Sequence, residues 1–319
     1  MPTAPLVRFG TSSFTAEGWV GPFYAQGTEP RDVLRVYART FDTVEVDATY
    51  SAIPSARTVD GWVEKTPEGF VLAAKFPRSI VHGGDAERPD PARVLDLEAT
   101  AADRDRFLEV MSRLGPRLGP LVLQFPYFNK TAFASPAPFL ERLDRFLEAL
   151  PKGHAYAVEV RNKAFMGKPL RDLCAKHRVA MVLVDQAWMP HGDEVEAKMD
   201  PVTADFAYLR LLGDRAEIEK LTTTWDREVI DRADRMARWA DLLARLAARG
   251  VRTFVYVNNH YAGHAPTTTK RLMEMYRARG GVTAEGGKEA GGVGGGGAGA
   301  SGAPPGRSRT DPEWEWPPV

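Results

Sequence analysis

Cysteine and long apolar runs are the two features that this 319-residue sequence has least of. Its single cysteine, Cys174, excludes an intramolecular disulfide. No apolar run approaches the ~18 residues of a membrane-spanning helix, so a membrane is not expected as a partner. The start, MPTAPLVRFG, lacks the charged and then apolar pattern of a signal peptide. These absences together predict a protein of the reducing cytoplasm.

The sequence also lacks an excess of charge of either sign. It has 42 basic and 42 acidic residues, so its formal net charge at pH 7 is zero. Net charge therefore gives no reason to expect a general attraction to nucleic acid or to an anionic membrane. Hydrophobic residues make up 44% of the chain, which is typical of a globular protein and excludes disorder as its general state.

Several cofactor and catalytic motifs are missing as well. The sequence contains no H-E-x-x-H, paired C-x-x-C or G-x-S-x-G, which would indicate a zinc site or a serine nucleophile. Gly292, Gly294 and Gly297 spell G-x-G-x-x-G, but no apolar strand precedes them and no helical pattern follows. The sequence therefore identifies no cofactor. Cys174 lies inside a helical pattern and is expected to be a small buried side chain.

Composition divides the chain into two regions. Residues 281–319 are rich in Gly and Pro, and we predict that they form a low-complexity flexible tail. Residues 1–280 alternate short β-branched or aromatic runs with longer stretches of helical period, so we expect them to form one domain. The expected strands are residues 6–10, 43–49, 70–76, 120–125, 155–160, 179–184, 206–212 and 252–258.

The expected strands are apolar nearly throughout, which is typical of parallel strands that are buried on both faces. Eight such strands separated by helices match a (β/α)8 barrel of the TIM type, for which ~250 residues is a typical length. We therefore predict an α/β fold with a single barrel domain. A doubly wound open sheet is the alternative, because hydrophobic periodicity does not reveal whether a sheet closes on itself.

Two of the expected helices have clear end signals. Ser135 followed by Pro136 suits a cap and a first helical residue, and apolar residues follow at three- and four-residue steps. A second amphipathic stretch starts after Trp225 with Val229, and Gly250 is expected just beyond its last turn.

Polar side chains follow every expected strand. Residues two apart on a strand share a face, so Glu45 with Asp47, and Glu159 with Arg161, project to the same side. In a barrel, the carboxyl ends of the strands meet at one mouth, where catalytic residues are found. The polar residues at these ends include Glu45, Lys75, Arg78, Gln124, Glu159, Arg161, Asp185, Arg210, Asn258, Asn259 and His260.

A mixed cluster of this kind suits a polar or anionic ligand, because arginine binds phosphate or carboxylate and a carboxylate or histidine transfers protons. A metal ion is not expected, since the cations of the same mouth would repel it. For each residue, the alternative is a structural ion pair. We assign catalysis to Glu45, Glu159, Asp185 and His260, and ligand binding to Lys75, Arg78, Arg161, Arg210, Asn258 and Asn259.

A series of short motifs lies at or near the ends of the expected strands. They are Gly10-Thr11-Ser12, Gly18-Trp19, Gly21-Pro22-Phe23-Tyr24, residues 43–50, Lys75-Phe76-Pro77-Arg78, Gln124-Phe125-Pro126, residues 158–161, residues 208–211 and residues 256–265. In sequence and order they resemble the YecE-like family, domain of unknown function 72, over about residues 7–275. The resemblance implies a TIM barrel with a distant kinship of shape to barrels that cleave damaged DNA. It does not supply an established reaction.

Two segments depart from the pattern of that family. After Arg161 the family tends to carry His and Trp, whereas this chain has Asn162, Lys163 and Phe165. After the glutamate of the second strand the family usually has Asn-Ser-Thr-Phe, whereas this chain reads Asp47-Ala48-Thr49-Tyr50, which adds a negative charge. The histidine-rich metal ligands that are expected of the DNA-repair barrels are absent from the sequence.

The sequence therefore predicts a cytoplasmic barrel protein that binds or acts on a phosphate-bearing ligand, either a nucleotide or a nucleic acid. A non-catalytic protein that binds a ligand or a partner is the first alternative. A metal-dependent phosphodiesterase or endonuclease-like hydrolase is the second. The sequence identifies neither the reaction nor a protein partner.

Overall fold

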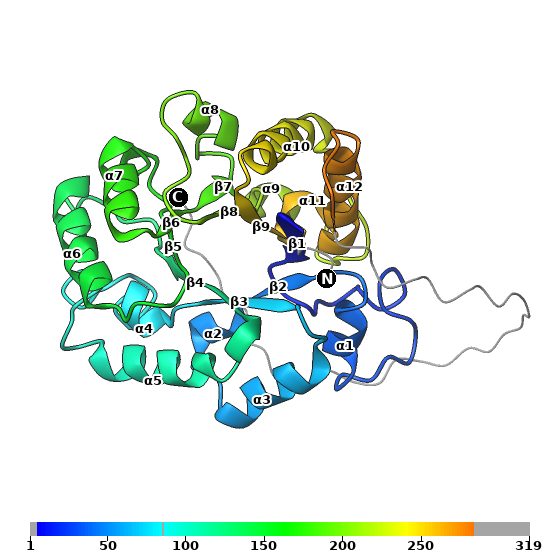
Figure 1. Cartoon of the computed structure of the whole chain (residues 1–319), viewed down its shortest axis with the longest axis horizontal. Helices are drawn as coiled ribbons and strands as arrows, with labels where there is room; N and C mark the ends of the chain where they lie inside the picture. The colour runs from blue at the N-terminus through cyan, green and yellow to red at the C-terminus, as the bar shows by residue number, and fades with distance from the viewer. Residues whose placement is uncertain (1–4, 85, 284–319) are drawn as a thin grey trace, which may run out of the picture.

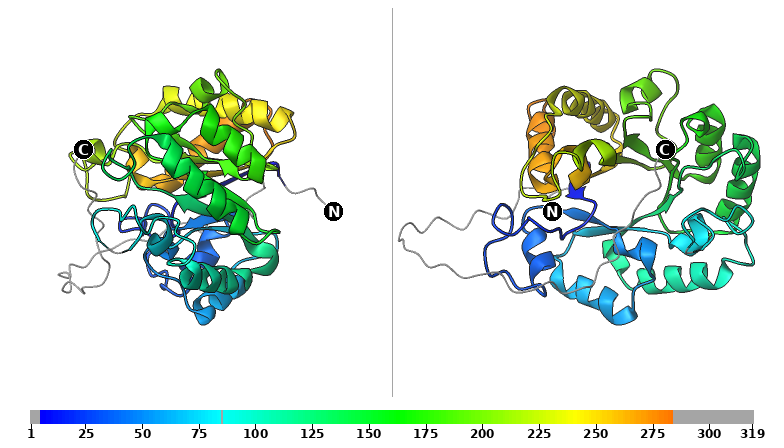
Figure 2. Two further views of the ribbon diagram at one scale, coloured as in Figure 1. Left: turned by 90° about the vertical axis from the view of Figure 1, so that its left-hand side faces the viewer. Right: turned by 180° about the vertical axis from the view of Figure 1, so that it is seen from behind.

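A computed structural model of the chain describes residues 5–84 and 86–283. Short strands lie inside a layer of helices, as Figure 1 and the two views of Figure 2 show. The predicted α/β barrel of the TIM type is confirmed, and the sixth expected strand is divided in two. The strands are β1 Val7–Thr11, β2 Thr43–Val46, β3 Val71–Lys75, β4 Leu118–Gln124, β5 Tyr156–Glu159, β6 Ala180–Met181, β7 Leu183–Asp185, β8 Phe206–Leu211 and β9 Arg252–Val257.

Helices connect the strands, and the predicted tail lies outside the described residues from residue 284 onward. Ser135 and Pro136 are the N-cap and first residue of α6, as predicted, and Gly250 follows α10 with a φ of 72°. The helices are α1 Val33–Tyr37, α2 Ala48–Ser51, α3 Ala56–Lys65, α4 Arg78–Val81, α5 Ala101–Ser112, α6 Pro136–Ala149, α7 Lys168–His177, α8 Gly192–Glu196, α9 Arg215–Ile218, α10 Ala233–Ala248, α11 Asn259–Ala262 and α12 Ala265–Arg277, with 3-10 turns η1 Gly115–Arg117 and η2 Lys163–Phe165.

Helix α10 begins later than the sequence pattern predicts. Val229 and Ile230 precede it, and their backbone N–H groups donate to the carbonyl oxygen of Ala262 at 2.7 and 3.2 Å. This pairing holds the segment against α11, so the helix begins at Ala233.

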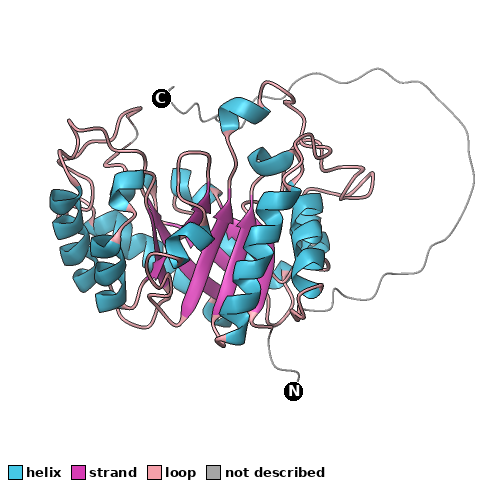
Figure 3. Ribbon diagram, turned by 90° about the horizontal axis from the view of Figure 1, so that it is seen from above, coloured by secondary structure: helices cyan, strands magenta, loops and turns pink. Residues whose placement is uncertain are grey.

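The strands form two parallel ladders that meet at one interrupted strand. One ladder joins β2, β3, β4, β5 and β6 in that order, and the other joins β7, β8, β9 and β1. Between β6 and β7 lies Val182, whose N–H donates to the carbonyl oxygen of Val158 on β5 at 2.9 Å. The two ladders are therefore continuous at this position, and the strand arrows point the same way (Figure 3).

Within the described residues, β1 and β2 form no backbone ladder. Hydrogen bonds of side chains join these two strands instead. The N–H of Phe9 donates to Asp42 Oδ1 at 3.2 Å, and that of Thr11 donates to the hydroxyl of Tyr37 at 2.8 Å. Tyr37 in turn donates to the carbonyl oxygen of Thr43 at 3.2 Å. An aspartate and a tyrosine thus take the place of a strand-to-strand ladder at this seam.

Gly10 allows the close approach of the two strands at the seam, since a Cβ there would lie 2.1 Å from the carbonyl oxygen of Thr43. We expect Gly10→Ala to lower the free energy of unfolding by about 1–3 kcal/mol, because the backbone must shift. Chemical denaturation measures the change. Gly61→Ala in α3 is the matched control: its Cβ meets no atom within 4 Å, and a stabilisation of up to about 1 kcal/mol is expected. Similar effects at both positions would contradict the close approach.

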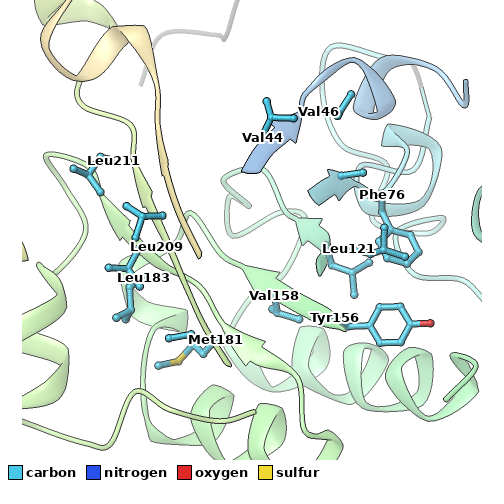
Figure 4. Close-up of a cluster of buried hydrophobic side chains, with 14 of the residues drawn as sticks. Val44, Val46, Phe76, Leu121, Tyr156, Val158, Met181, Leu183, Leu209 and Leu211 are labelled. Atoms are coloured by element: carbon cyan, nitrogen blue, oxygen red, sulfur yellow. The ribbon is translucent and has the colours of Figure 1, made fainter. Parts of the chain in front are cut away.

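Apolar side chains on the two faces of the strands form two separate cores. The outward-facing core, which includes Val44, Leu121 and Leu183, packs against the helices (Figure 4). The inward-facing core includes Val122 and Val184. Because side chains alternate between faces, the inward positions at the carboxyl ends of the strands are those of the polar residues Glu45, Lys75, Gln124, Glu159 and Arg210.

Candidate functional site

Arg210, on β8, lies at the centre of a charged cluster inside the barrel mouth, with a side chain that is 1% exposed. Its Nη1 donates to Gln124 Oε1 at 2.7 Å and to Glu159 Oε2 at 2.6 Å. Its Nη2 donates to Glu45 Oε1 at 2.6 Å. One guanidinium therefore ties β8 to β2, β4 and β5 across the interior.

Glu45 and Glu159 are fully buried carboxylates. Burial acts to raise the pKa of Glu159, but the neighbouring Arg161, at 2.5 Å, and Arg210 hold that pKa at about 2. Burial likewise opposes ionisation of Glu45, and Arg210 with Lys75 keeps its pKa below the ordinary value. Both carboxylates are therefore fixed negative charges at neutral pH.

Asp47, directly after β2, differs from these two carboxylates. Its side chain is 38% exposed, while its Oδ1 is buried at 2.6 Å from Lys75 Nζ and 3.9 Å from Arg210 Nη2. Burial of this oxygen raises the pKa of Asp47, against the opposing field of Lys75. Sequence reasoning gave Asp47 no role, although its shared face with Glu45 and its departure from the family pattern were both visible signals.

Three further predicted ligand-binding cations lie around the cluster. The side chains of Lys75 and Arg161 are 8% and 11% exposed. Arg78, the first residue of α4, is buried and donates from Nη2 to the carbonyl oxygen of Ala86. Burial raises the pKa of the Tyr50 hydroxyl to about 12, while the fields of Arg78 and Arg161 lower it. Tyr50 therefore lies close to both arginines.

A cavity of about 180 Å³ opens between the carboxyl ends of β1, β2 and β9, and Asp47 lines it beside the charged cluster. Ser12, Asn258 and His260 contribute further polar groups to its walls. Asn258 Oδ1 accepts from the backbone N–H of His260 at 2.9 Å and lies 2.6 Å from its Nδ1. Burial lowers the pKa of His260, and Arg215 lowers it further. The cavity thus has neutral hydrogen-bonding groups facing one carboxylate.

Asp185, one of the four residues that the sequence predicts to be catalytic, lies outside this cluster. Its carboxylate accepts hydrogen bonds from Trp239 Nε1 at 2.6 Å, from the Tyr261 hydroxyl at 2.9 Å and from Arg235. The reason is strand geometry: Val184 belongs to the inward-facing core, so the next residue faces the helices. Asp185 therefore ties β7 to α10 and α11.

Asn259 also serves the fold, although it lines the cavity. Its Oδ1 accepts from Trp19 Nε1 at 3.1 Å and from the backbone N–H of Ala265 at 2.9 Å. This amide oxygen joins the segment after β1 to the start of α12. We therefore expect Asn259 to contribute less than Asn258 to orienting a ligand.

Within residues 5–84 and 86–283, no three His, Cys, Asp or Glu side chains are grouped so that they could hold a metal ion. None of the helices in these residues is long and apolar enough to cross a membrane. Cys174 is buried in α7, as predicted, and burial raises the pKa of its thiol to about 12.

The parallel strands, the surrounding helices and the polar mouth define a protein of the TIM-barrel type with an ionic cluster and a small cavity at the carboxyl ends of its strands. The chain belongs to the family described as "Protein of unknown function DUF72", which matches residues 8–290. This match confirms the resemblance that the sequence motifs indicated.

The chain is also similar to individual proteins, one compared by sequence and two by structure. The UPF0759 protein YecE of Escherichia coli K12 is 36% identical over 135 residues, or 42% of this chain, and the match spans 43% of the length of that relative. A DUF72 family protein of Thermotoga maritima has a TM-score of 0.64 at 25% identity, covering 85% of this chain and 99% of that one. Another from Enterococcus faecalis has a TM-score of 0.61 at 20% identity, covering 85% and 95%.

Proposed function

We propose that the protein binds and acts on a phosphate-bearing ligand, such as a nucleotide or the end of a nucleic acid, at the barrel mouth. The observation that carries this proposal is that two cations at the edge of the ionic cluster, Lys75 and Arg161, keep 8% and 11% of their side chains exposed. The whole cluster contains the cations Lys75, Arg78, Arg161 and Arg210 and the carboxylates Glu45, Asp47 and Glu159.

Arg210 is held by Glu45 and Glu159, so we assign it to the support of the cluster and no longer to ligand binding. Lys75 and Arg161 lie at the edge of the cluster, where both retain some exposure. We assign the anion to this edge, because a guanidinium and an ammonium together bind phosphate oxygens well.

Asp47 is the group to which we assign proton transfer. A general acid or base needs contact with the ligand and a pKa near the working pH. Asp47 is half-exposed beside the cavity and has a raised pKa, whereas the pKa values of Glu45 and Glu159 are lowered by their arginines. His260, across the same cavity, is the second candidate.

Inorganic phosphate is the probe that tests the anion site, with calorimetric titration of the wild type and of two variants. We expect Lys75→Gln and Arg161→Lys each to raise the Kd by about tenfold or more, because a charged hydrogen bond contributes roughly 1.5–3 kcal/mol. Arg161→Lys keeps the charge but loses the two parallel donors of the guanidinium.

Lys163→Gln is the matched control, since it removes an exposed charge from the turn that follows β5. Its Kd for phosphate should match that of the wild type, and thermal melts establish that each variant is folded. A folded wild type that does not bind phosphate would overturn the proposal, and so would an equal loss of affinity in the control.

A further inference from the structure

Ser12 presents a buried hydroxyl to the cavity. Its side chain is 2% exposed, and its Oγ has no hydrogen-bond partner among the described residues. The neighbouring Ser13 differs, because its hydroxyl donates to the carbonyl oxygen of Thr15 at 2.9 Å. Since an unsatisfied buried hydroxyl is unfavourable, the Ser12 group calls for a partner supplied from the cavity.

The other cavity walls offer further hydrogen-bonding groups around Ser12. Asp47 supplies carboxylate oxygens, Asn258 an amide and His260 an imidazole. Alcohol groups match such a set, because each alcohol both donates and accepts a hydrogen bond. The cavity of about 180 Å³ has the volume of about six water molecules at roughly 30 Å³ each, which suits a short hydroxylated carbon chain.

The cavity and the anion site share a wall. Asp47 lines the cavity, and its Oδ1 lies 2.6 Å from Lys75 Nζ. If the hydroxyl groups of a ligand occupy the cavity, a further group at the end of the ligand beside Asp47 lies close to Lys75. Phosphate is the substituent that the proposed function assigns to that place.

We propose that the ligand is a phosphate ester of a short sugar or polyol, with a hydroxyl of its carbon chain bonded to Ser12 and its phosphate beside Lys75. This inference rests on the proposed function and deepens it by naming the ligand class. The same chemistry occurs in a free sugar phosphate and in the ribose phosphate of a nucleotide.

Calorimetric titration with ribose 5-phosphate, AMP and inorganic phosphate tests the inference. We expect the wild type to bind ribose 5-phosphate about tenfold more tightly than inorganic phosphate, because several hydroxyl groups gain hydrogen bonds in the cavity. Ser12→Ala should remove most of this gain and leave the Kd of inorganic phosphate unchanged. Ser13→Ala, whose hydroxyl is engaged in its own turn, should keep the gain.

The outcomes separate this inference from the proposed function. If phosphate binds but ribose 5-phosphate binds no more tightly, or if Ser12→Ala weakens both probes equally, the sugar site is wrong and the anion site stands. If the folded wild type binds neither probe, both proposals are wrong. Tighter binding of AMP than of ribose 5-phosphate supports a nucleotide as the source of the sugar phosphate, and the reverse order supports a free sugar phosphate.

Discussion

Arg210→Leu is expected to lower the free energy of unfolding by about 3–5 kcal/mol, because removing one partner of a buried ion pair leaves the other uncompensated. Glu45 and Glu159 each lie 2.6 Å from the guanidinium and neither is exposed to water, so both lose their shared partner at once. Among the described residues, Glu45 then keeps Lys75 as its cationic partner, at 3.9 Å, and Glu159 keeps Arg161, at 2.5 Å. Gln124 Oε1 also loses a donor at 2.7 Å. Chemical denaturation at neutral pH measures the loss.

The loss should depend on pH, because the carboxylates respond to protonation. In the wild type, the pKa of Glu159 is about 2, so its contribution to stability is complete above its unfolded-state pKa of about 4.3. That contribution is lost as the pH falls from there toward 2. In Arg210→Leu, Glu159 has lost one of its two neighbouring cations, so its protonation costs the variant less stability than the wild type. The difference between their free energies of unfolding should therefore narrow below about pH 4.3.

Arg245→Leu is the matched control, because its pair with Glu196 lies on the surface with 47% of the arginine side chain exposed. An exposed pair contributes little, so this variant should melt close to the wild type. If Arg210→Leu were no more damaging than Arg245→Leu, the cluster would have to be accessible to water, and Arg210 would not be the buried support of the cluster that we assign it to be.

The sequence predicted the strands and the residues at their ends well, because strands buried on both faces read as short apolar runs. The side on which Glu45 and Glu159 project could also be predicted, because each has a polar residue two positions later, at Asp47 and Arg161. What the pattern could not show is which opposite charges meet. Whether Arg210 binds a ligand or forms a structural ion pair depends on β2 and β5 lying across the barrel from β8.

The expected strand at residues 179–184, which the structure divides into β6 and β7, shows most clearly what the sequence pattern cannot predict. From Val179 to Val184 every residue is apolar, so no polar alternation reveals which face points inward. The structure puts Val182 and Val184 in the inward-facing core, which turns Asp185 outward and makes Gln186 the next inward position. Gln186 is buried, and its Oε1 has no hydrogen-bond partner within the described residues, so it is the polar residue that sequence reasoning missed beside Asp185.

Asp185→Asn is expected to lower the free energy of unfolding by roughly 3 kcal/mol, because three donors converge on this carboxylate. Trp239 Nε1 and the Tyr261 hydroxyl both donate to Oδ2, and Arg235 donates to Oδ1. An asparagine has one acceptor oxygen in place of two, and its amide nitrogen would face a donor. The change is nearly isosteric, so the loss reports hydrogen bonding and not a cavity.

The same variant separates a role in the fold from a role in the site. Phosphate affinity of the folded Asp185→Asn protein should equal that of the wild type, because the carboxylate lies on the helix side of β7 and the anion is assigned to the barrel interior. Asp205→Asn, whose exposed pair with Arg178 leaves the aspartate side chain 71% accessible, is the control and should change neither stability nor affinity. A stable Asp185→Asn protein that fails to bind phosphate would return Asp185 to the site, and would mean that the mouth acts through α10 and α11 as well as through the interior cluster.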